Sequence, residues 1–242
     1  MQDLTNSTLQ KPMILDCTLR DGGYYGDWDF DKETVRKYLA AMATAKVDII
    51  EIGFRFLPQN TFFGPFAYST DEYLSSLPLP PELSIAVMVN ANELLAYPDG
   101  IEPAVDRLFG PCDHSPVDIV RLAIHIKDLP ACRELAVSLK RLGYQVAVNL
   151  MKTGGLSGNE LGHLAAQVTK WGMVDILYFA DSFGNLNPED VQNMVYALQK
   201  EWAGAIGIHT HDNKGQALAN CVAAIEAGVT FVDSTVLGMG RG

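Results

Sequence analysis

Short apolar segments recur along the chain and alternate with stretches of helical periodicity. Eight of them are rich in Val and Ile and apolar at most positions, which is typical of parallel strands covered on both faces. Three begin with the same Val-Asp-Ile triplet, at Val47, Val117 and Val174. The predicted strands are residues 13–20, 46–54, 83–89, 116–124, 144–150, 173–180, 205–211 and 230–236.

The segments between these strands carry helix signals at their ends. Asp31 is a plausible N-cap, and Asn187 followed by Pro188 is typical of a helix start. Gly143, Gly172 and Gly228 stand where helices usually stop. Helices are predicted over residues 31–45, 129–143, 159–172, 187–202 and 215–228.

This alternation of strands and helices predicts a (β/α)8 barrel, an α/β fold of the TIM-barrel type. The alternative is a doubly wound open sheet, but no Gly-x-Gly-x-x-Gly follows the first strand. We expect a single barrel domain over residues 12–242, preceded by a flexible arm of residues 1–11. Only Leu-Gly-Met-Gly-Arg-Gly follows the last strand, so the eighth helix is expected to be missing from this chain. The arm, a partner or further chain beyond Gly242 would then cover the gap.

Composition excludes several classes of partner. The 242 residues are 48% hydrophobic and carry a net charge of −11, without a Lys/Arg cluster, so neither nucleic acid nor an anionic membrane is expected. The four cysteines form no Cys-x-x-Cys pair, which fits reduced thiols in a cytoplasmic protein. The polar start lacks the apolar core of a signal peptide, and no apolar run approaches the length of a membrane span.

Polar residues gather at the ends of the predicted strands, where such barrels keep their active sites. In the first strand, alternation would put Asp16, Thr18 and Arg20 on one face, next to Asp21. The long segment 55–82, dense in aromatic residues and proline, is expected to serve the same end of the barrel. The other polar residues at these ends are Glu51, Arg55, Arg121, His125, Asn149, Asp181, Ser182, His209, His211, Asp233 and Thr235.

The triplet His209-Thr210-His211 is a candidate metal site. Two histidines separated by one residue on a strand point the same way, and a carboxylate from Asp21 would complete a set suited to Mn²⁺, Mg²⁺, Zn²⁺ or Fe²⁺. The alternative for the histidines is a buried pair bonded to backbone carbonyls. The alternative for Asp21 is a turn aspartate that caps the Gly22-Gly23 turn.

Two motifs carry a resemblance to a known family. Asp-Cys-Thr-Leu-Arg-Asp-Gly (16–22) and His-Thr-His-Asp-Asn-Lys-Gly-Gln-Ala-Leu-Ala-Asn (209–220) resemble the DRE-TIM metallolyase, or HMG-CoA-lyase-like, superfamily. Stretches 120–125, 179–191 and 226–242 also look like it. The resemblance implies a divalent metal, Mn²⁺ or Mg²⁺ with Zn²⁺ as a third option, bound by Asp21, His209 and His211. It also implies that Arg20 stabilises an enolate oxygen, with the Gly22-Gly23 pair letting the backbone turn so that Arg20 and Asp21 both face the pocket.

The residues after Arg20-Asp21-Gly22 indicate which branch of the superfamily the chain resembles most. Gly23-Tyr24 stands where the Claisen-condensing synthases have Glu-Gln and the HMG-CoA lyases have Leu-Gln, and this lies nearer the hydroxy-oxo-acid aldolases, which have Met-His. Tyr24 therefore occupies the position of the catalytic histidine of that branch. Tyr24 and His125 are the catalytic candidates beside Arg20, and Tyr25 or a metal-bound water are alternatives for the base.

The remaining candidates are assigned to substrate binding. Glu51 and Asp181 are expected in or under the site; the alternative is a buried carboxylate paired with an arginine. Arg55 is expected to pair with a substrate carboxylate, and residues 62–73 to cover the substrate or form a subunit interface. The full set of substrate-binding candidates is Asp16, Glu51, Arg55, Arg121, Asp181 and Thr235.

The leading functional hypothesis is a metal-dependent lyase that cleaves a 4-hydroxy-2-oxo acid into pyruvate, or a related 2-oxo acid, and an aldehyde. One alternative is acyl-CoA-dependent Claisen condensation or cleavage, against which the missing Glu-Gln speaks. Another alternative is a non-catalytic metal-binding barrel. The presence of the motif residues speaks against it, namely Arg20, Asp21, His209 and His211. The expected partners are a small 2-oxo acid and, by the resemblance, a second copy of the chain in a homodimer.

Overall fold

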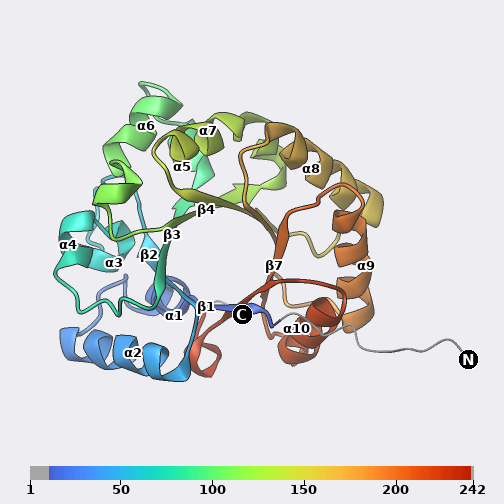
Figure 1. The fold of residues 1–242 in the computed structure, drawn as a ribbon, viewed down its shortest axis with the longest axis horizontal. Helices are drawn as coiled ribbons and strands as arrows, with labels where there is room; N and C mark the ends of the chain where they lie inside the picture. The colour runs from blue at the N-terminus through green and yellow to red at the C-terminus, as the bar shows by residue number, and fades with distance from the viewer. Residues whose placement is uncertain (1–10, 241–242) are drawn as a thin grey trace, which may run out of the picture.

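The computed structural model describes residues 11–240, which form a closed barrel of eight parallel strands ringed by helices (Figure 1). Each strand pairs with the next along the chain, and the last pairs with the first. The predicted (β/α)8 barrel is thus confirmed, and the doubly wound sheet is wrong. The strands are β1 Met13–Asp16, β2 Ile49–Phe54, β3 Ser84–Asn90, β4 Ile119–His125, β5 Gln145–Met151, β6 Ile176–Asp181, β7 Ala205–Thr210 and β8 Phe231–Ser234.

The helices begin and end close to the predicted signals. Asp31 accepts a hydrogen bond from the backbone N–H of Thr34, and Asn187 forms a reciprocal capping box with Asp190. Gly172 ends its helix in the left-handed conformation. The α-helices are α1 Thr18–Asp21, α2 Lys32–Ala45, α3 Pro65–Tyr68, α4 Asp71–Ser75, α5 Ala91–Leu95, α6 Ile101–Leu108, α7 Arg133–Arg141, α8 Gly158–Trp171, α9 Pro188–Gln199 and α10 Ala217–Glu226. Four 3₁₀ helices are η1 Gly22–Tyr25, η2 Cys112–His114, η3 Ile126–Ala131 and η4 Val236–Gly238.

The first predicted strand is too long. It ends at Asp16, and α1 begins at Thr18, so Asp16, Thr18 and Arg20 do not share a strand face. Asp16 Oδ1 accepts a hydrogen bond from the backbone N–H of Thr18, and the backbone N–H of Asp21 donates to the carbonyl of Cys17. These local bonds favour a helical turn over a longer strand.

Arg20 and Asp21 both line a cavity at the carboxyl ends of the strands, and the Gly22-Gly23 pair beside them allows close packing without using a left-handed backbone. Gly22 has φ −66°, and neither glycine has a positive φ. A Cβ on Gly23 would lie 1.9 Å from Cδ1 of Trp28, so only glycine leaves room for the indole. The indole in turn donates a hydrogen bond from Nε1 to the carbonyl of Arg20, at 2.8 Å. Close packing against Trp28 therefore fixes the turn that carries Arg20 and Asp21.

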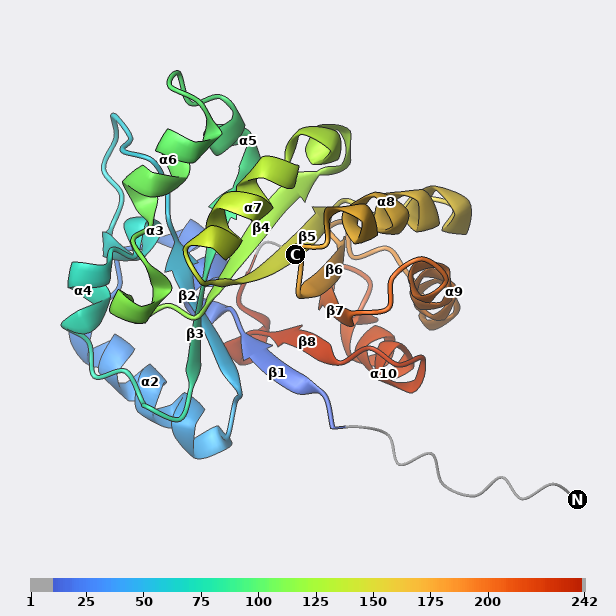
Figure 2. The same cartoon turned by 45° about the horizontal axis from the view of Figure 1, so that its top comes forward.

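Figure 2 shows the strands of the barrel with the helices around them. Side chains fill the barrel below the carboxyl ends of these strands. Tyr178 lies in this interior cluster, and a larger apolar cluster packs between the strands and the helices. Because the interior is filled, space for a ligand remains at the carboxyl ends. The interior cluster comprises Leu15, Cys17, Ile49, Ala86, Ile119, Ala147, Ile176 and Tyr178.

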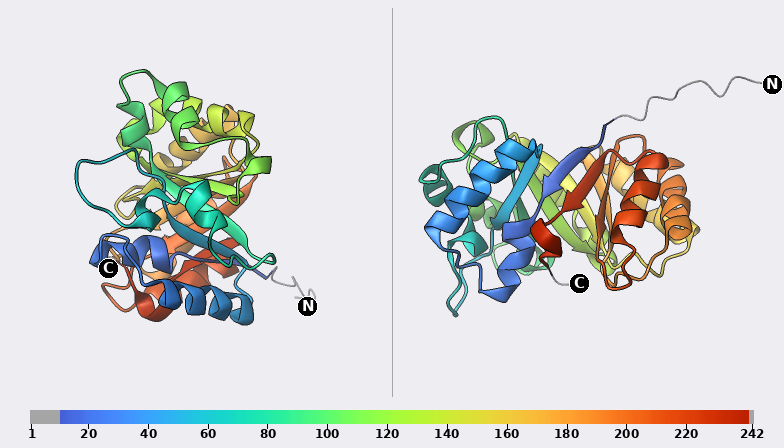
Figure 3. Two further views of the ribbon diagram at one scale, coloured as in Figure 1. Left: turned by 90° about the vertical axis from the view of Figure 1, so that its left-hand side faces the viewer. Right: turned by 90° about the horizontal axis from the view of Figure 1, so that it is seen from below.

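β8 and β1 lack a covering helix in the described part of the chain. The right-hand view of Figure 3 shows the two strands side by side between α2 and α10. In the described residues β8 is followed only by the short turn η4. A groove of about 580 Å³ lies there, with Leu218, Val222 and Ile225 of α10 on one wall. The predicted arm lies, except for Lys11, outside the described residues. None of the described helices combines the length and apolarity needed to cross a membrane.

Candidate active site

A cavity of about 510 Å³ opens at the carboxyl ends of the strands. Its walls combine apolar side chains, such as Phe54 and Met88, with polar groups from several strands. Six of its residues were predicted from the sequence, namely Arg20, Asp21, Tyr24, His125, His209 and His211. Asn149 and Ser182, named from the sequence only as polar residues at strand ends, also line the cavity. The polar lining that the sequence analysis missed is Asn90, Asn92 and Lys152, each at or just after the end of a strand.

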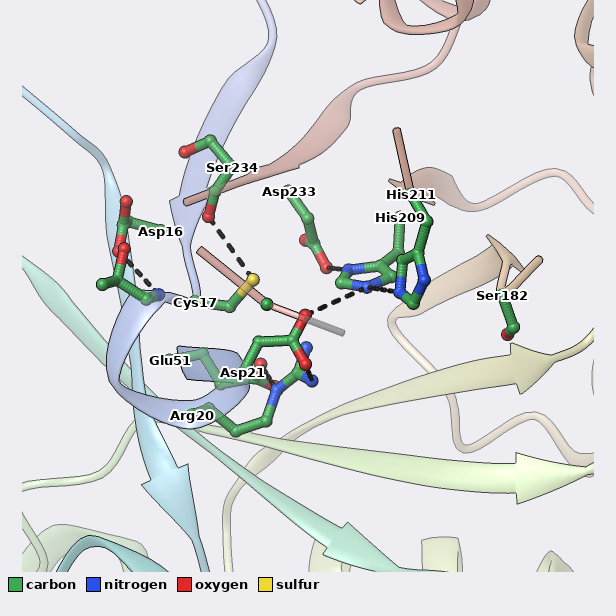
Figure 4. Close-up of polar contacts among 12 residues, drawn as sticks. Asp16, Cys17, Arg20, Asp21, Glu51, Ser182, His209, His211, Asp233 and Ser234 are labelled. Atoms are coloured by element: carbon green, nitrogen blue, oxygen red, sulfur yellow. Dashed lines mark hydrogen bonds and ion pairs between the residues drawn. The ribbon is translucent and has the colours of Figure 1, made fainter. Parts of the chain in front are cut away.

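Asp21, His209 and His211 converge at one end of this cavity (Figure 4). The Nε2 atoms of the two histidines lie 3.2 Å apart, and Asp21 Oδ2 lies 3.7 Å from Nε2 of His209. One ligand atom from each residue falls within 4.8 Å of the others. Burial and the neighbouring His209 lower the pKa of His211, which favours the neutral imidazole that a metal requires. Two imidazoles and a carboxylate therefore fit a divalent cation.

Asp233 orients His209 from behind. Its Oδ2 lies 2.7 Å from Nδ1 of His209 and also accepts a hydrogen bond from Nη2 of Arg121, at 2.7 Å. Burial acts to raise the pKa of Asp233, but Arg121 and the hydrogen bond with His209 hold that pKa below its usual value. An ionised Asp233 accepts the Nδ1 proton, and the lone pair on Nε2 is left facing Asp21.

Arg20 is held in place by two ion pairs. Its Nε atom lies 2.6 Å from Oε2 of Glu51, and its Nη1 atom lies 2.9 Å from Oδ1 of Asp21. The other oxygen of Glu51 lies 3.0 Å from Nη1 of Arg121. All of these side chains are buried, and the carboxylates raise the pKa of Arg20 against the effect of burial.

These contacts close into a ring of buried charged and polar groups beneath the cavity, which we call the ion-pair ring. It runs through residues from or beside β1, β2, β4, β7 and β8, with acidic and basic groups alternating. Such alternation compensates the cost of burying each charge. In order around the ring, its members are Asp21, Arg20, Glu51, Arg121, Asp233 and His209.

Glu51 and Arg121 thus lie under the site and do not line the cavity. For Glu51 the alternative considered above, a buried carboxylate paired with arginine, describes its surroundings. Arg121 also lies over the ring of Tyr178, with its Cζ atom 4.1 Å from the ring centroid. Both residues therefore support Arg20 and Asp233 from below.

Arg55 lies elsewhere, and its pairing with a substrate carboxylate has to be corrected. Its guanidinium donates to the carbonyls of Ser69 and Leu108, each at 3.0 Å, and pairs with Asp71. These contacts satisfy the guanidinium within the chain and tie the segment containing α3 and α4 to the barrel.

Asp16, Asp181 and Thr235 are likewise absent from the cavity lining. Asp16 accepts hydrogen bonds from Tyr38 and Thr18, and Asp181 accepts the backbone N–H groups of residues 185 and 186. Thr235 lies in the groove beside α10. Each of the two aspartates therefore shapes a turn at the end of its own strand.

Aromatic rings form the wall beside Arg20. Tyr24 packs edge-on against Trp28, with ring centroids 4.7 Å apart, and against Phe54. Trp28 also contacts Phe63, so the aromatic segment after β2 packs partly into this wall. Tyr25 donates to the carbonyl of Gly240 and is not among the residues that line the cavity.

Known proteins are similar to this chain in sequence and in fold. The family model described as HMGL-like matches residues 126–242. A 4-hydroxy-2-oxovalerate aldolase of Carboxydothermus hydrogenoformans is 30% identical over 239 residues, covering 96% of this chain and 67% of its own length. An oxaloacetate decarboxylase of Mycobacterium tuberculosis is 28% identical, with 99% and 68% covered. This chain thus spans about two thirds of the length of these curated relatives.

Solved structures of related proteins have the same fold. The N-terminal domain of a candidate aldolase from Bacteroides vulgatus is 33% identical and superposes with a TM-score of 0.81, covering 96% of this chain and 75% of that one. An HMG-CoA lyase of Bacillus subtilis, at 17% identity and a TM-score of 0.75, shares the fold over 95% of this chain and 78% of its own. With these relatives and the motifs around Arg20 and His209, the chain belongs to the HMGL-like family.

Proposed function

We propose that this chain is a divalent-metal-dependent aldolase that cleaves a 4-hydroxy-2-oxo acid into pyruvate, or a related 2-oxo acid, and an aldehyde. The observation that carries the proposal is the convergence of Asp21, His209 and His211 beside the fixed guanidinium of Arg20. Relatives named 4-hydroxy-2-oxovalerate aldolase, about 30% identical over most of the chain, act on this class of compound.

Asp21, His209 and His211 would hold the cation, and Mn²⁺ or Mg²⁺ suits a mixed histidine and carboxylate set, with Zn²⁺ as a third option. When bound, the cation supplies positive charge beside the 2-oxo group of the substrate. The chain itself supplies the second charge, because Glu51 and Asp21 hold Arg20 in place before the substrate enters. Such preorganisation favours the negative oxygen of an enolate.

Cleavage requires a base for the proton of the 4-hydroxyl group. We assign this role to His125, which lies at the end of β4 and lines the cavity. A phenol ordinarily keeps its proton at neutral pH and then cannot accept another, whereas a neutral imidazole can, so we prefer His125 to Tyr24. Loss of the proton forms the aldehyde carbonyl, the C3–C4 bond breaks, and its electron pair enters the enolate. A proton returned to C3 then gives the 2-oxo acid.

Decarboxylation of oxaloacetate is a second candidate, favoured by the relative of that name. Loss of CO₂ from oxaloacetate leaves the same pyruvate enolate, so Arg20 would act on the same oxygen. The acyl-CoA alternative has less support, since the HMG-CoA lyase structures are under 25% identical and share only the fold.

The test is pyruvate release from a panel of 4-hydroxy-2-oxo acids and oxaloacetate, with Mn²⁺ or Mg²⁺ and with a chelator. We expect chelator-sensitive release that Asp21→Ala abolishes and that Asp113→Ala, an exposed aspartate on η2, leaves unchanged. Binding of metal without pyruvate from any compound of the panel would overturn the proposal.

We also propose that the chain works as a homodimer in the cytoplasm. The dimer is an inference from the family alone, and multi-angle light scattering of the purified protein tests it. A monomer mass at the concentrations used for activity would overturn it.

A further inference from the structure

The wall of the cavity is poor in acidic groups although the chain as a whole is acidic. The net charge of the protein is −11, yet Asp21 is the one carboxylate among the described residues that line the cavity. Asp21 is already engaged with Arg20 and belongs to the candidate metal ligands. The rest of the polar lining is neutral or cationic, so the cavity favours an anion beyond what the metal ligands provide.

Lys152 supplies a positive charge on the side of the barrel opposite β1, the strand that precedes Arg20 and Asp21. It follows β5 directly, and β5 lies four strands from β1 in either direction around the barrel. Lys152 lines the cavity and forms no ion pair within residues 11–240. A hollow next to the cavity continues past His125 to Lys127, again without an acidic residue. Lys152 therefore lines both the cavity and the adjoining hollow, and Lys127 lines the hollow.

The backbone of Lys152 is held in an unusual conformation. Its φ is 60°, in the left-handed region that lysine rarely adopts. Its N–H donates to the hydroxyl of Ser182, at 3.0 Å, and Figure 4 shows Ser182 on the His211 side of the metal-ligand group. Backbone strain of this kind tends to occur at ligand sites. The strained turn fixes the start of the lysine side chain at the cavity.

Asn149 and His125 lie on the same part of the cavity wall as Lys152. Asn149 is buried, lines the cavity, and its Oδ1 atom lacks a hydrogen-bond partner within the described residues. An unpartnered buried acceptor is costly unless a ligand completes it, so Asn149 marks a point of the cavity wall where a donor from the ligand is expected. Met151 is two residues further along the same face, and Lys152 follows. His125, the proposed base for the 4-hydroxyl, pairs with Met151 across β4 and β5, so a substrate whose 4-hydroxyl meets His125 has its C4 side near Lys152.

Resting on the proposed aldolase function, we propose that the natural substrate is a 4-hydroxy-2-oxo acid with a second anionic group on the C4 side. That group, a carboxylate or a phosphate ester, pairs with Lys152. The aldehyde product then carries the anion, and the 2-oxo acid product is the same as for a neutral substrate. Lys152 thus acts as a specificity residue, remote from the bond that breaks.

Two substrates of equal chain length test this. 4-Hydroxy-2-oxoglutarate has a carboxylate at C5, whereas 4-hydroxy-2-oxovalerate has a methyl group there. We expect kcat/KM to favour the dianion about tenfold, as a charge-assisted hydrogen bond would give. The C5 phosphate ester of 4,5-dihydroxy-2-oxovalerate, compared with the carboxylate, identifies which anion is preferred.

The variants assign the preference to Lys152. Lys152→Met should abolish the preference by lowering kcat/KM for the dianion, whereas Lys152→Arg should retain most of the preference. The matched control is Lys170→Met, at the end of α8, which should keep the wild-type preference. Equal preference in the wild type, or a preference that survives Lys152→Met, would overturn the inference.

A binding measurement separates failure of this inference from failure of the proposed function. 2-Oxoglutarate and 2-oxovalerate lack the 4-hydroxyl and cannot be cleaved, so their Kd values for the Mn²⁺-loaded protein do not depend on catalysis. We expect 2-oxoglutarate to bind about tenfold more tightly, and Lys152→Met to equalise the two. Equal binding together with cleavage of 4-hydroxy-2-oxovalerate would overturn the role of Lys152 and leave the aldolase standing. Tighter binding of 2-oxoglutarate without cleavage of any 4-hydroxy-2-oxo acid would support the anion site at Lys152 and overturn the aldolase function.

Discussion

Asp233 Oδ2 lies 2.7 Å from Nδ1 of His209, on the side of the imidazole that faces away from Asp21 and His211. The same oxygen is 2.7 Å from Nη2 of Arg121, so one carboxylate ties a candidate metal ligand to the ion-pair ring. Through Arg121 and Glu51 this connection reaches Arg20. The candidate metal ligands and the arginine proposed to stabilise the enolate are therefore held by one continuous set of buried contacts.

Asp233→Asn should weaken metal binding. An amide removes the charged acceptor for the Nδ1 proton, so Nε2 is no longer reserved as the free nitrogen. Loss of such a supporting partner typically costs about 10–100-fold in metal affinity. Isothermal titration of the metal-free protein with Mn²⁺ measures it, with Asp113→Asn on the surface as the control. An unchanged Kd for Mn²⁺ would show that Asp233 does not orient His209.

Glu51→Gln should destabilise the fold as well as the site. The substitution removes the charge that separates two buried guanidinium groups, those of Arg20 and Arg121. Breaking a buried ion pair from one side costs about 3–5 kcal/mol. Urea unfolding should therefore show a clear loss of stability. Glu33→Gln, in the exposed pair with Arg36, should leave the midpoint unchanged, and equal midpoints for the two variants would contradict the role given to the ring.

The sequence predicted the barrel well because its strands are buried on both faces and read as continuous apolar runs. It failed at residues 17–20, where the polar residues Asp16, Thr18 and Arg20 alternate by coincidence while local hydrogen bonds favour a helical turn. The metal-ligand set could be proposed because it lies in compact motifs.

The support beneath the site could not be predicted in the same way. Glu51 contacts Arg121 across the interior of the barrel, from a strand that is not adjacent, and such pairing depends on strand tilt and register. Arg55 stands at a strand end like the true lining residues, yet it turns outward to Asp71. Lys152 belongs to no motif, and its left-handed conformation has no signal in the residue type.

Gly23→Ala should lower stability and activity together. The new Cβ would lie 1.9 Å from Trp28 Cδ1, so the indole or the turn after β1 has to move. Overpacking of this kind costs about 1–3 kcal/mol, and movement of Trp28 also disturbs its hydrogen bond to the carbonyl of Arg20. Thermal unfolding followed by tryptophan fluorescence measures the effect. Gly155→Ala is the control, because a Cβ there meets nothing within 4 Å. If both variants melt alike, Gly23 is not required for packing.

His125→Ala should reduce kcat more than Tyr24→Phe does. Removing a general base typically costs about 10²–10⁴-fold in rate, whereas Tyr24→Phe keeps the ring that packs against Trp28 and Phe54. Neither residue belongs to the candidate metal ligands, so Mn²⁺ affinity should stay the same in both variants and rule out loss of the cation as the cause. Steady-state pyruvate release, measured at saturating Mn²⁺, gives the comparison. If Tyr24→Phe instead abolishes kcat and His125→Ala leaves it within about twofold, the base is the tyrosine and the assignment of His125 is wrong.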